Sequence, residues 1–278
     1  MRRLRAQLAR LSAVPWPVRI EGPTGSGKGL AARLLHHWSA RGVGPFTTCN
    51  INSIAEGLEI AELVGYVRGA FTGAVMEHTG AFEAAHGGTL FLDELGTASA
   101  RVQRALLQLV EEGAVRRLGE QRSRRVDVRL VFATNTSLEE AVVSGRFRRD
   151  LYYRLGSLVI RMPSLAERPE DIPELAAAIL EMKAKELGTG VPALGDEQVA
   201  ALLSYDWPGN VRQLDRALEH FAVFGKLSEE VLHAPRTADW RERLGEALTR
   251  NDGNRSATAR DLGISRKTLY QELKQRQA

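Results

Sequence analysis

The chain has 278 residues, 44% of them hydrophobic, which is enough for two domains, or for one large and one small domain, with a buried core. No apolar run approaches the roughly 18 residues that a membrane helix needs, and the basic first residues lack the apolar stretch of a signal peptide. Cys49 is the only cysteine, so a disulfide framework is excluded and a reducing compartment is favoured. We therefore expect a cytoplasmic protein without a membrane span.

The net charge of +4 is unevenly distributed along the chain. Residues 241–278 contain nine Lys and Arg against five Asp and Glu, so the whole positive excess falls in this last segment. A basic tail is often only a solvated tail. This one also has apolar residues at helical spacing, which favours binding to nucleic acid.

The first expected element is an amphipathic helix over Arg2–Leu11, because its leucines recur at helical spacing. Short apolar runs then alternate with helical patterns through the first 160 residues. This alternation predicts an α/β fold with a parallel sheet and helices on both faces, whose ligands bind beyond the carboxyl ends of the strands. The expected strands are Val18–Glu21, Phe46–Asn50, Thr89–Asp93 and Val128–Thr134, with a helix face of Val102, Ala105, Leu106, Leu109 and Val110 between the last two.

From about Pro169 the apolar pattern is helical, which predicts a small all-α subdomain. Its expected helices are Ile172–Leu187, Glu197–Tyr205 and Asn210–Phe224. We expect an α/β subdomain over 1–165, the helical subdomain over 166–226, a linker over 227–240 and a third helical unit over 241–278.

A glycine-rich stretch between the first strand and a helical pattern at Leu30–Trp38 predicts a P-loop that binds ATP. Its glycines let backbone N–H groups surround phosphate oxygens, the helix N-terminus adds its dipole, and the lysine adds a full charge. A chance glycine-rich turn is the alternative, but the strand, lysine and helix together favour the P-loop. The residues are Gly22, Pro23, Thr24, Gly25, Ser26, Gly27 and Lys28, followed by Gly29 where many P-loops carry a Ser or Thr that ligates Mg²⁺.

Two adjacent carboxylates, Asp93 and Glu94, stand at the carboxyl end of the apolar strand Thr89–Asp93. Asp93 can hold Mg²⁺, directly or through water, and Glu94 can orient and polarise the attacking water. An isolated Asp-Glu pair is more often a helix cap. Together with a P-loop upstream, the pair indicates the Walker B motif of an ATPase.

A series of further motifs resembles those of the sigma-54-dependent transcriptional activators, which are AAA+ P-loop NTPases. The resemblance implies an AAA+ α/β subdomain, an all-α lid and a C-terminal Fis-type helix-turn-helix, assembled as a homo-hexameric ring. The implied partners are sigma-54 with RNA polymerase and double-stranded DNA upstream of promoters. The motifs are ELVG at 62–65, GAFTGA at 69–74, GAFE at 80–83, GGTLFLDE at 87–94, ATN at 133–135, FRRDLYYR at 147–154 and WPGNVR at 207–212.

The resemblance assigns the 69–74 loop to sigma-54 contact. Its small residues and two glycines leave an aromatic side chain on a flexible tip, which can present an apolar anchor to a partner. A lone phenylalanine would more often pack into a core. The loop residues are Gly69, Ala70, Phe71, Thr72, Gly73 and Ala74.

The resemblance also assigns roles around the nucleotide. Asn50 matches the asparagine that pairs with the Walker B glutamate, and Thr134 with Asn135 matches sensor I. Arg148 and Arg154 match arginine fingers, which stabilise the transferred phosphoryl group of a neighbouring subunit. Without the resemblance, these residues would be a strand-end asparagine, a turn and solvated arginines. The lid contributes the sensor II arginine, Arg212.

Some positions depart from the family pattern. Pro23 and Gly29 stand where the family usually has acidic residues, and only about 20 residues precede the P-loop, although part of that region normally contacts adenine. We expect no N-terminal regulatory domain, so that control comes from a partner protein such as a separate inhibitor, from expression level, or not at all. Val64 and Gln213 replace a usual Phe and a usual Glu, and both look tolerable.

The last 38 residues resemble a helix-turn-helix, with Gly263 at the turn between two helical stretches. N-terminal residues of a recognition helix reach base edges, and flanking charges hold phosphates. The alternative is a generic three-helix bundle with charged faces. Ser265 caps the second helix, Arg266, Lys267, Thr268 and Tyr270 are its early exposed positions, and Asn254, Arg255 and Arg260 are expected at phosphates.

Three functions fit these observations. The first is an ATP-driven activator that remodels the sigma-54 RNA polymerase closed complex. The second is a DNA-binding regulator whose ATPase has decayed, for which Pro23 and Gly29 speak. The third is an AAA+ remodeller of another client, against which the intact 69–74 loop speaks.

Overall fold

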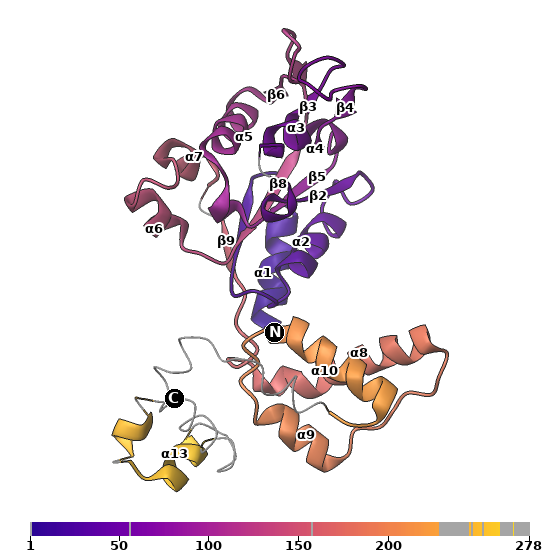
Figure 1. Cartoon of the computed structure of the whole chain (residues 1–278), viewed down its shortest axis with the longest axis vertical. Coiled ribbons are helices and arrows are strands. Elements are labelled where there is room, and N and C mark those ends of the chain that lie inside the picture. The colour runs from indigo at the N-terminus through magenta and orange to yellow at the C-terminus, as the bar shows by residue number, and fades with distance from the viewer. Residues whose placement is uncertain are drawn as a thin grey trace. The chain divides into compact units, whose positions relative to one another are not determined.

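The computed structural model describes residues 2–55, 57–156, 158–227, 245, 247–251, 253–261 and 269. The chain divides into two compact units, Met1–Met162 and Pro163–Ala278, which are described separately (Figure 1). None of the helices in the described part of the chain is long and apolar enough to cross a membrane.

The first unit is built on a five-stranded sheet in which every neighbouring pair of strands is parallel. The four predicted strands are confirmed, except that the last begins at Arg129 rather than Val128. The edge strand at 159–161 was not predicted. In sheet order the strands are β2 (Phe46–Asn50), β5 (Thr89–Asp93), β8 (Arg129–Thr134), β1 (Val18–Glu21) and β9 (Val159–Arg161).

Helices cover both faces of this sheet, because alternate residues of each buried strand point to opposite sides. On β5, Leu90 and Leu92 pack into one apolar cluster, whereas Phe91 packs into the other. The first cluster is completed by α3 (Glu59–Val64), α4 (Ala81–Ala84), α5 (Ala100–Glu112), α6 (Leu138–Val143) and α7 (Arg149–Arg154), and the second by α1 (Arg2–Ser12) and α2 (Lys28–His37).

The predicted N-terminal helix is α1, and it is an integral part of this unit. Leu4 and Leu8 are buried in the cluster beneath α1 and α2. The buried Arg129 guanidinium donates to the carbonyls of Leu11, at 2.6 Å, and Leu35, at 3.0 Å, near the ends of both helices. The arginine thereby satisfies carbonyl groups that a helix end leaves without intrahelical partners.

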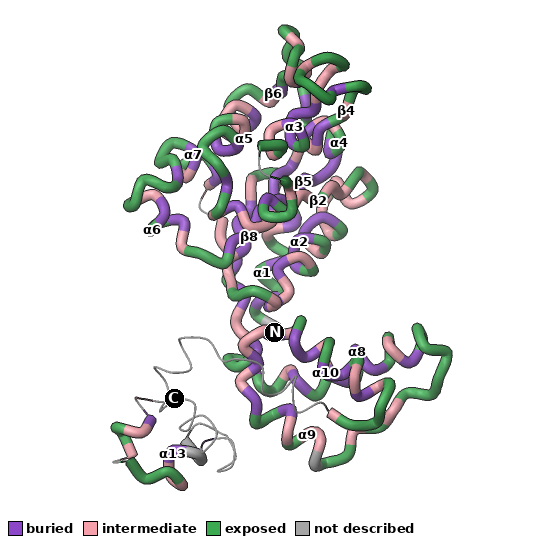
Figure 2. Tube along the Cα trace, in the orientation of Figure 1, coloured by how far each residue is buried: buried purple, intermediate pink, exposed green. Residues whose placement is uncertain are grey.

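Two small hairpins lie in this unit, beyond the strands of the main sheet. The strands β3 (Gly65–Tyr66) and β4 (His78–Thr79) flank the 69–74 loop, and β6 (Ala114–Val115) pairs with β7 (Arg124–Arg125). A bridge between Tyr66 and Leu118 joins the two hairpins. Figure 2 shows buried segments gathered at the centre of the unit, with exposed segments toward the ends of the hairpins.

The second unit contains a helical core around Trp207, which is buried at 1% exposure, with its indole N–H donating to the Leu202 carbonyl at 2.8 Å. The helices predicted at 172–187 and 210–224 are confirmed with those bounds. The middle helix begins one residue earlier and ends two residues earlier than predicted. They are α8 (Ile172–Leu187), α9 (Asp196–Leu203) and α10 (Asn210–Phe224), and a further helix, α13, spans Arg255–Asp261.

Candidate nucleotide and partner-contact sites

The predicted P-loop joins β1 to α2 and folds closely on itself. Gly22 has a φ of 153°, and a Cβ there would lie 2.6 Å from the Met162 carbonyl oxygen, so this position requires glycine. Gly27, the residue before α2, is in the left-handed region, at φ 102°. Lys28 is 6% exposed, and its ammonium group donates to the carbonyls of Gly22, at 2.9 Å, and Pro23, at 3.2 Å. The lysine charge is therefore fixed at the loop, where phosphates would bind.

The predicted sensor I residues lie beside this loop, because β8 pairs with β1. The Gly22 N–H donates to the Thr134 carbonyl at 3.3 Å, and the Asn135 amide donates to the Thr24 hydroxyl at 3.3 Å. The sheet thus brings together two segments that are more than 100 residues apart in the sequence. A polar side chain at Asn135 can therefore respond to what the P-loop holds.

Of the two Walker B carboxylates, Asp93 is the last residue of β5, next to the end of β2, and Glu94 follows it. Asn50 and Asp93 are register partners, and the Asn50 amide lies 3.5 Å from an Asp93 carboxylate oxygen. Glu94 has φ 58° and ψ 39°, a left-handed conformation that costs a non-glycine residue about 1–2 kcal/mol. The Glu94 carbonyl accepts from the Thr97 hydroxyl at 2.7 Å, which closes the turn that follows. Backbone strain of this kind is found at functional sites.

Asp93 is the carboxylate of this site that fits a magnesium ion. Among the described residues, no group of three or more His, Cys, Asp or Glu could hold a metal ion. Mg²⁺ in nucleotide sites usually keeps several waters and binds one or two carboxylates together with the phosphates. The residues present therefore suit a metal held jointly with a nucleotide.

Both candidate arginine fingers are paired with carboxylates of their own unit. Arg148 contacts Asp150 through two nitrogens, at 3.0 and 2.6 Å, and Arg154 lies 3.3 Å from Glu111. The Asp150 pKa falls to about 2, first because Arg148 hydrogen-bonds to it. The side chains of Arg148 and Arg154 are 41% and 62% exposed, so both guanidinium groups are open to solvent. Arg212, the sensor II candidate, lies on an exposed position of α10 in the second unit.

The 69–74 loop is a tight turn whose tip is exposed. Gly69 and Gly73 both have positive φ, and the Gly69 N–H donates to the Ala74 carbonyl at 2.9 Å. Phe71 is 38% exposed, and its ring meets the edge of the Tyr66 ring at a centroid distance of 5.0 Å. Val75 and Met76, which sequence reasoning missed, are 73% and 76% exposed. The loop and the two residues after it therefore expose three apolar side chains, those of Phe71, Val75 and Met76.

A charge network that sequence reasoning also missed fixes the base of this loop. The buried Arg117 guanidinium holds both carboxylate oxygens of Glu83, at 2.6 and 2.8 Å, and lies 3.4 Å from Glu77. Arg124 lies 3.5 Å from Glu83. These contacts join the segment after the loop to the β6–β7 hairpin, so that the two hairpins are connected by charge as well as by backbone.

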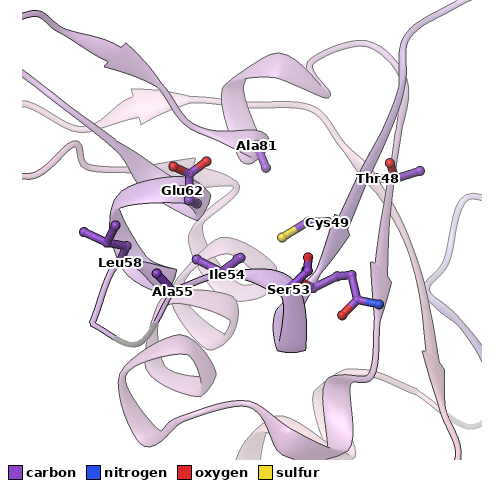
Figure 3. Close-up of a pocket in the computed structure, with 9 residues that line it drawn as sticks. Thr48, Cys49, Ser53, Ile54, Ala55, Leu58, Glu62 and Ala81 are labelled. Atoms are coloured by element: carbon purple, nitrogen blue, oxygen red, sulfur yellow. The ribbon is translucent and has the colours of Figure 1, made fainter.

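A cavity of about 390 Å³ lies beside Asn50, between the end of β2 and α3. Figure 3 shows the Cys49 thiol and the Glu62 carboxylate among the side chains around it. Burial, and then the Glu62 charge, raise the pKa of the Cys49 thiol to about 11. The thiol is thus held in its neutral form at physiological pH, and it is a weak nucleophile there.

The DNA-contact prediction falls only partly on described residues. Asn254 caps α13, because its side-chain oxygen accepts from the backbone N–H groups of Ser256 and Ala257, each at 3.1 Å. Arg255 is exposed. The Arg260 backbone lies in α13, and the predicted positions Ser265, Arg266, Lys267, Thr268 and Tyr270 lie outside the described residues.

Three features define the class: the parallel sheet, the P-loop that follows β1, and the Walker B carboxylates at the end of β5. The chain is an AAA+ P-loop ATPase. The profile of the Sigma-54 interaction domain matches residues 1–161, that of the AAA+ ATPase lid domain matches 166–237, and that of the Fis-family bacterial regulatory proteins matches 241–275. The chain belongs to the sigma-54-dependent transcriptional activators, with a nucleotide-binding ATPase domain and a DNA-binding helix-turn-helix.

Named relatives agree with this family. The chain is 42% identical over 286 residues to the C4-dicarboxylate transport transcriptional regulatory protein DctD of Pseudomonas aeruginosa, covering 99% of this chain and 62% of that protein. It is 40% identical to the transcriptional regulatory protein ZraR of Salmonella typhimurium, covering 98% of this chain and 66% of the relative. The chain thus spans a little under two thirds of these proteins.

Among solved structures, NtrX from Brucella abortus in complex with ATP is similar, with a TM-score of 0.76 at 31% identity. The similarity covers 99% of this chain and 67% of that one. The same protein in complex with ADP matches with the same TM-score.

Proposed function

We propose that the chain is an ATP-hydrolysing activator that remodels the sigma-54 RNA polymerase closed complex through its 69–74 loop while bound to upstream DNA. The observation that carries the proposal is that P-loop, Walker B and sensor I residues all lie at the carboxyl ends of the parallel strands. There the Asn135 amide contacts Thr24, and the Asn50 amide contacts Asp93. The exposed loop at 69–74, with Phe71 at its tip, supports sigma-54 as the client. A cytoplasmic location follows from these partners.

The proposed chemistry divides among residues at this edge. Lys28 and the backbone of 22–29 hold the phosphates, and Asp93 holds Mg²⁺ through water. Glu94 polarises the attacking water, while Asn50, whose amide lies 3.5 Å from Asp93, restrains Glu94 until the client engages. Thr134 and Asn135 sense the γ-phosphate, and Arg212 of the lid closes over the nucleotide. Positioning and charge stabilisation dominate phosphoryl transfer, so fixed side chains of this kind are what the reaction needs.

The arginine fingers require a ring in this proposal. Arg148 and Arg154 act on the nucleotide of a neighbouring subunit of a homo-hexamer. Each is ion-paired within its own unit, and both are exposed, which supports their release toward a stronger anion. Exposed ion pairs contribute about 0–1 kcal/mol, so a neighbour's phosphate can displace them.

The helix-turn-helix segment, residues 241–278, tethers the ring to double-stranded DNA. Arg255 and Arg260 are proposed to contact phosphates, and the residues from Ser265 to Tyr270 to enter the groove. Asn254 caps α13 through its side-chain oxygen, which leaves its amide group to meet a phosphate. A separate inhibitor protein is the proposed source of control.

The alternative of a decayed ATPase is not favoured by the P-loop geometry. A Cβ at Gly29 would lie 3.9 Å from Phe91, which is an ordinary contact distance, so packing does not require glycine at this position. The Pro23 carbonyl accepts from Lys28, so that the uncharged residue still takes part in the loop. The metal would then depend on Asp93 and the phosphates alone.

The test is ATP turnover by the full chain, measured against protein concentration for the wild type and for Glu94→Gln. We expect turnover per subunit to rise cooperatively with concentration, and Glu94→Gln to lower it by about 100-fold or more, because a positioned acid–base group contributes about 10²–10⁴ in rate. An absence of turnover at every concentration, with DNA binding intact, would support the decayed ATPase. Capture of sigma-54 only with a transition-state nucleotide analogue would exclude another client.

A further inference from the structure

The side chain of Gln103, on α5, occupies a buried position between the turn that follows β5 and the segment that leads into α7. It is 2% exposed. Its amide nitrogen donates to the carbonyls of Ala98, at 2.8 Å, and Arg146, at 3.0 Å. Its oxygen accepts from the Arg148 N–H at 2.8 Å. Both donor hydrogens and the acceptor are thus used in short hydrogen bonds to backbone.

One of these segments begins at the Walker B glutamate. The 3-10 turn η2 (Leu95–Thr97) is flanked by Glu94 at its N-terminal end and by Ala98 at its C-terminal end. Hydrogen bonds from Thr97 to the Glu94 carbonyl and from the Ala98 N–H to the Leu95 carbonyl, at 3.1 Å, make this turn a closed unit. A shift of the Glu94 backbone would therefore move the Ala98 carbonyl, which Gln103 holds.

The other segment leads into α7 and carries the candidate finger Arg148. Phe147 is 2% exposed and fixed in the core, with its N–H donating to the Ala141 carbonyl at 2.9 Å. The backbone groups on either side of Phe147 are the two that Gln103 binds. Gln103 therefore fixes the backbone from which the Arg148 side chain projects.

We infer that Gln103 is a positioning residue that couples the Glu94 turn of one subunit to the finger that this subunit offers to its neighbour. The inference rests on the proposed trans role of Arg148. The Gln103 side chain is buried and its amide is used by backbone groups, so it is a positioning residue and not a catalytic one. It acts by holding the Ala98 and Arg148 backbones at a fixed separation, so that movement on the hydrolytic side is passed to the finger side.

An apolar side chain of the same size would break this coupling. Replacement of Gln103 by Met keeps the volume but leaves the Ala98 and Arg146 carbonyls and the Arg148 N–H without this partner. Buried backbone groups in that state favour displacement of the segment toward water. A displacement of about 1 Å in a positioning group can lower a rate by about 100-fold.

The experiment is a double-mutant cycle in ATP turnover, using Gln103→Met, Arg148→Ala and the double variant of the full chain. Affinity for a non-hydrolysable ATP analogue and the thermal unfolding midpoint are measured for each. Gln108→Met is the matched control, because Gln108 lies on the same helix and its side chain bonds to Glu112 at 3.0 Å on the exposed surface.

We expect Gln103→Met to lower kcat by about 100-fold with analogue affinity within about twofold. In the Arg148→Ala background the same change should cost less than about threefold, because residues that act as a unit are not additive. Gln103→Asn, which keeps an amide donor and acceptor on a side chain one methylene shorter, should lose less activity and provides the cycle if Gln103→Met does not fold. Gln108→Met should turn over ATP like the wild type.

Three results would overturn the inference. The first is wild-type kcat in Gln103→Met while Arg148→Ala is slow, which leaves the proposed finger standing. The second is a full, additive loss in the double variant, which would mean that Gln103 acts elsewhere. The third is wild-type turnover in Arg148→Ala, which would overturn the finger assignment itself and the coupling with it.

Discussion

The P-loop and the 69–74 loop are both glycine-rich turns with positive-φ glycines, yet their glycines do different work. A Cβ at Gly22 would meet the Met162 backbone at 2.6 Å, whereas no described atom lies within 4 Å of a Cβ built at Gly69 or Gly73. In the P-loop, glycine permits close packing as well as an unusual φ. In the 69–74 loop it permits only the turn and leaves the space around it open.

This difference matches what each loop meets. A phosphate group is small and constant, so a closed loop with a buried lysine can be organised in advance for it. A protein partner brings its own surface, so the other loop keeps Phe71 partly exposed and leaves the space beside Gly69 and Gly73 open. Glycine thus allows close packing in the P-loop and leaves open space in the 69–74 loop.

Alanine substitution at the two kinds of glycine should separate these uses most strongly. We expect Gly22→Ala to lower the free energy of unfolding by about 3 kcal/mol and to abolish ATP binding, because it adds overpacking against backbone to a strained φ. Gly73→Ala carries only the φ strain, about 1 kcal/mol. Chemical denaturation and nucleotide titration of both variants measure this. Equal losses would show that the space around the two glycines does not matter.

The second prediction concerns what the open loop presents. Phe71→Ala should weaken binding to sigma-54 by about 2 kcal/mol, or about 30-fold, as expected for a central aromatic anchor. Because Phe71 is already 38% exposed, the unfolding midpoint and ATP turnover should change little. Affinity is measured with a transition-state nucleotide analogue present, and Phe224→Ala, at an exposed site on the lid, is the control. A large loss of stability instead would assign Phe71 to packing.

The sequence predicted the main sheet well because its central strands are continuous apolar runs. β9 was not predicted, because a strand of three residues is too short to show a periodic pattern. The two-residue strands of the hairpins exist only through tertiary contacts such as that of Tyr66 with Leu118. Helices α8 and α10 were placed with the right bounds because Pro173, near the start of α8, and the glycines at 188 and 225 mark their ends.

The candidate site was predictable as a set of residues but not as a geometry. The motifs named Asn50, Asp93 and Glu94, but the contact from Asn50 to Asp93 depends on the register of β2 against β5. The left-handed backbone of Glu94 and the position of Gln103 have no sequence signature, because both arise from how the turn after β5 packs. A buried glutamine on an amphipathic helix is evident only when its backbone partners, far along the chain, are known.

The smallest expected effect is a difference in reactivity between two thiols. One is Cys49, beside the nucleotide site, and the other is a cysteine introduced at the exposed Thr72 of the 69–74 loop. Burial and the Glu62 charge raise the pKa of Cys49 to about 11 by penalising the thiolate, so its reactive fraction is small at neutral pH and grows until the pH passes that value. The exposed Thr72→Cys thiol should follow the usual pKa of about 8.5.

At pH 8 we therefore expect iodoacetamide to modify Cys49 about tenfold more slowly, since the greater nucleophilicity of a high-pKa thiolate offsets part of the difference in ionisation. Mass spectrometry of the Thr72→Cys chain follows both sites in one sample, and Glu62→Gln should accelerate modification of Cys49 alone. In urea the two rates should converge. Equal rates in the native protein would mean that the end of β2 is as open as the loop, and the contrast between a closed nucleotide edge and an open partner surface would then be wrong.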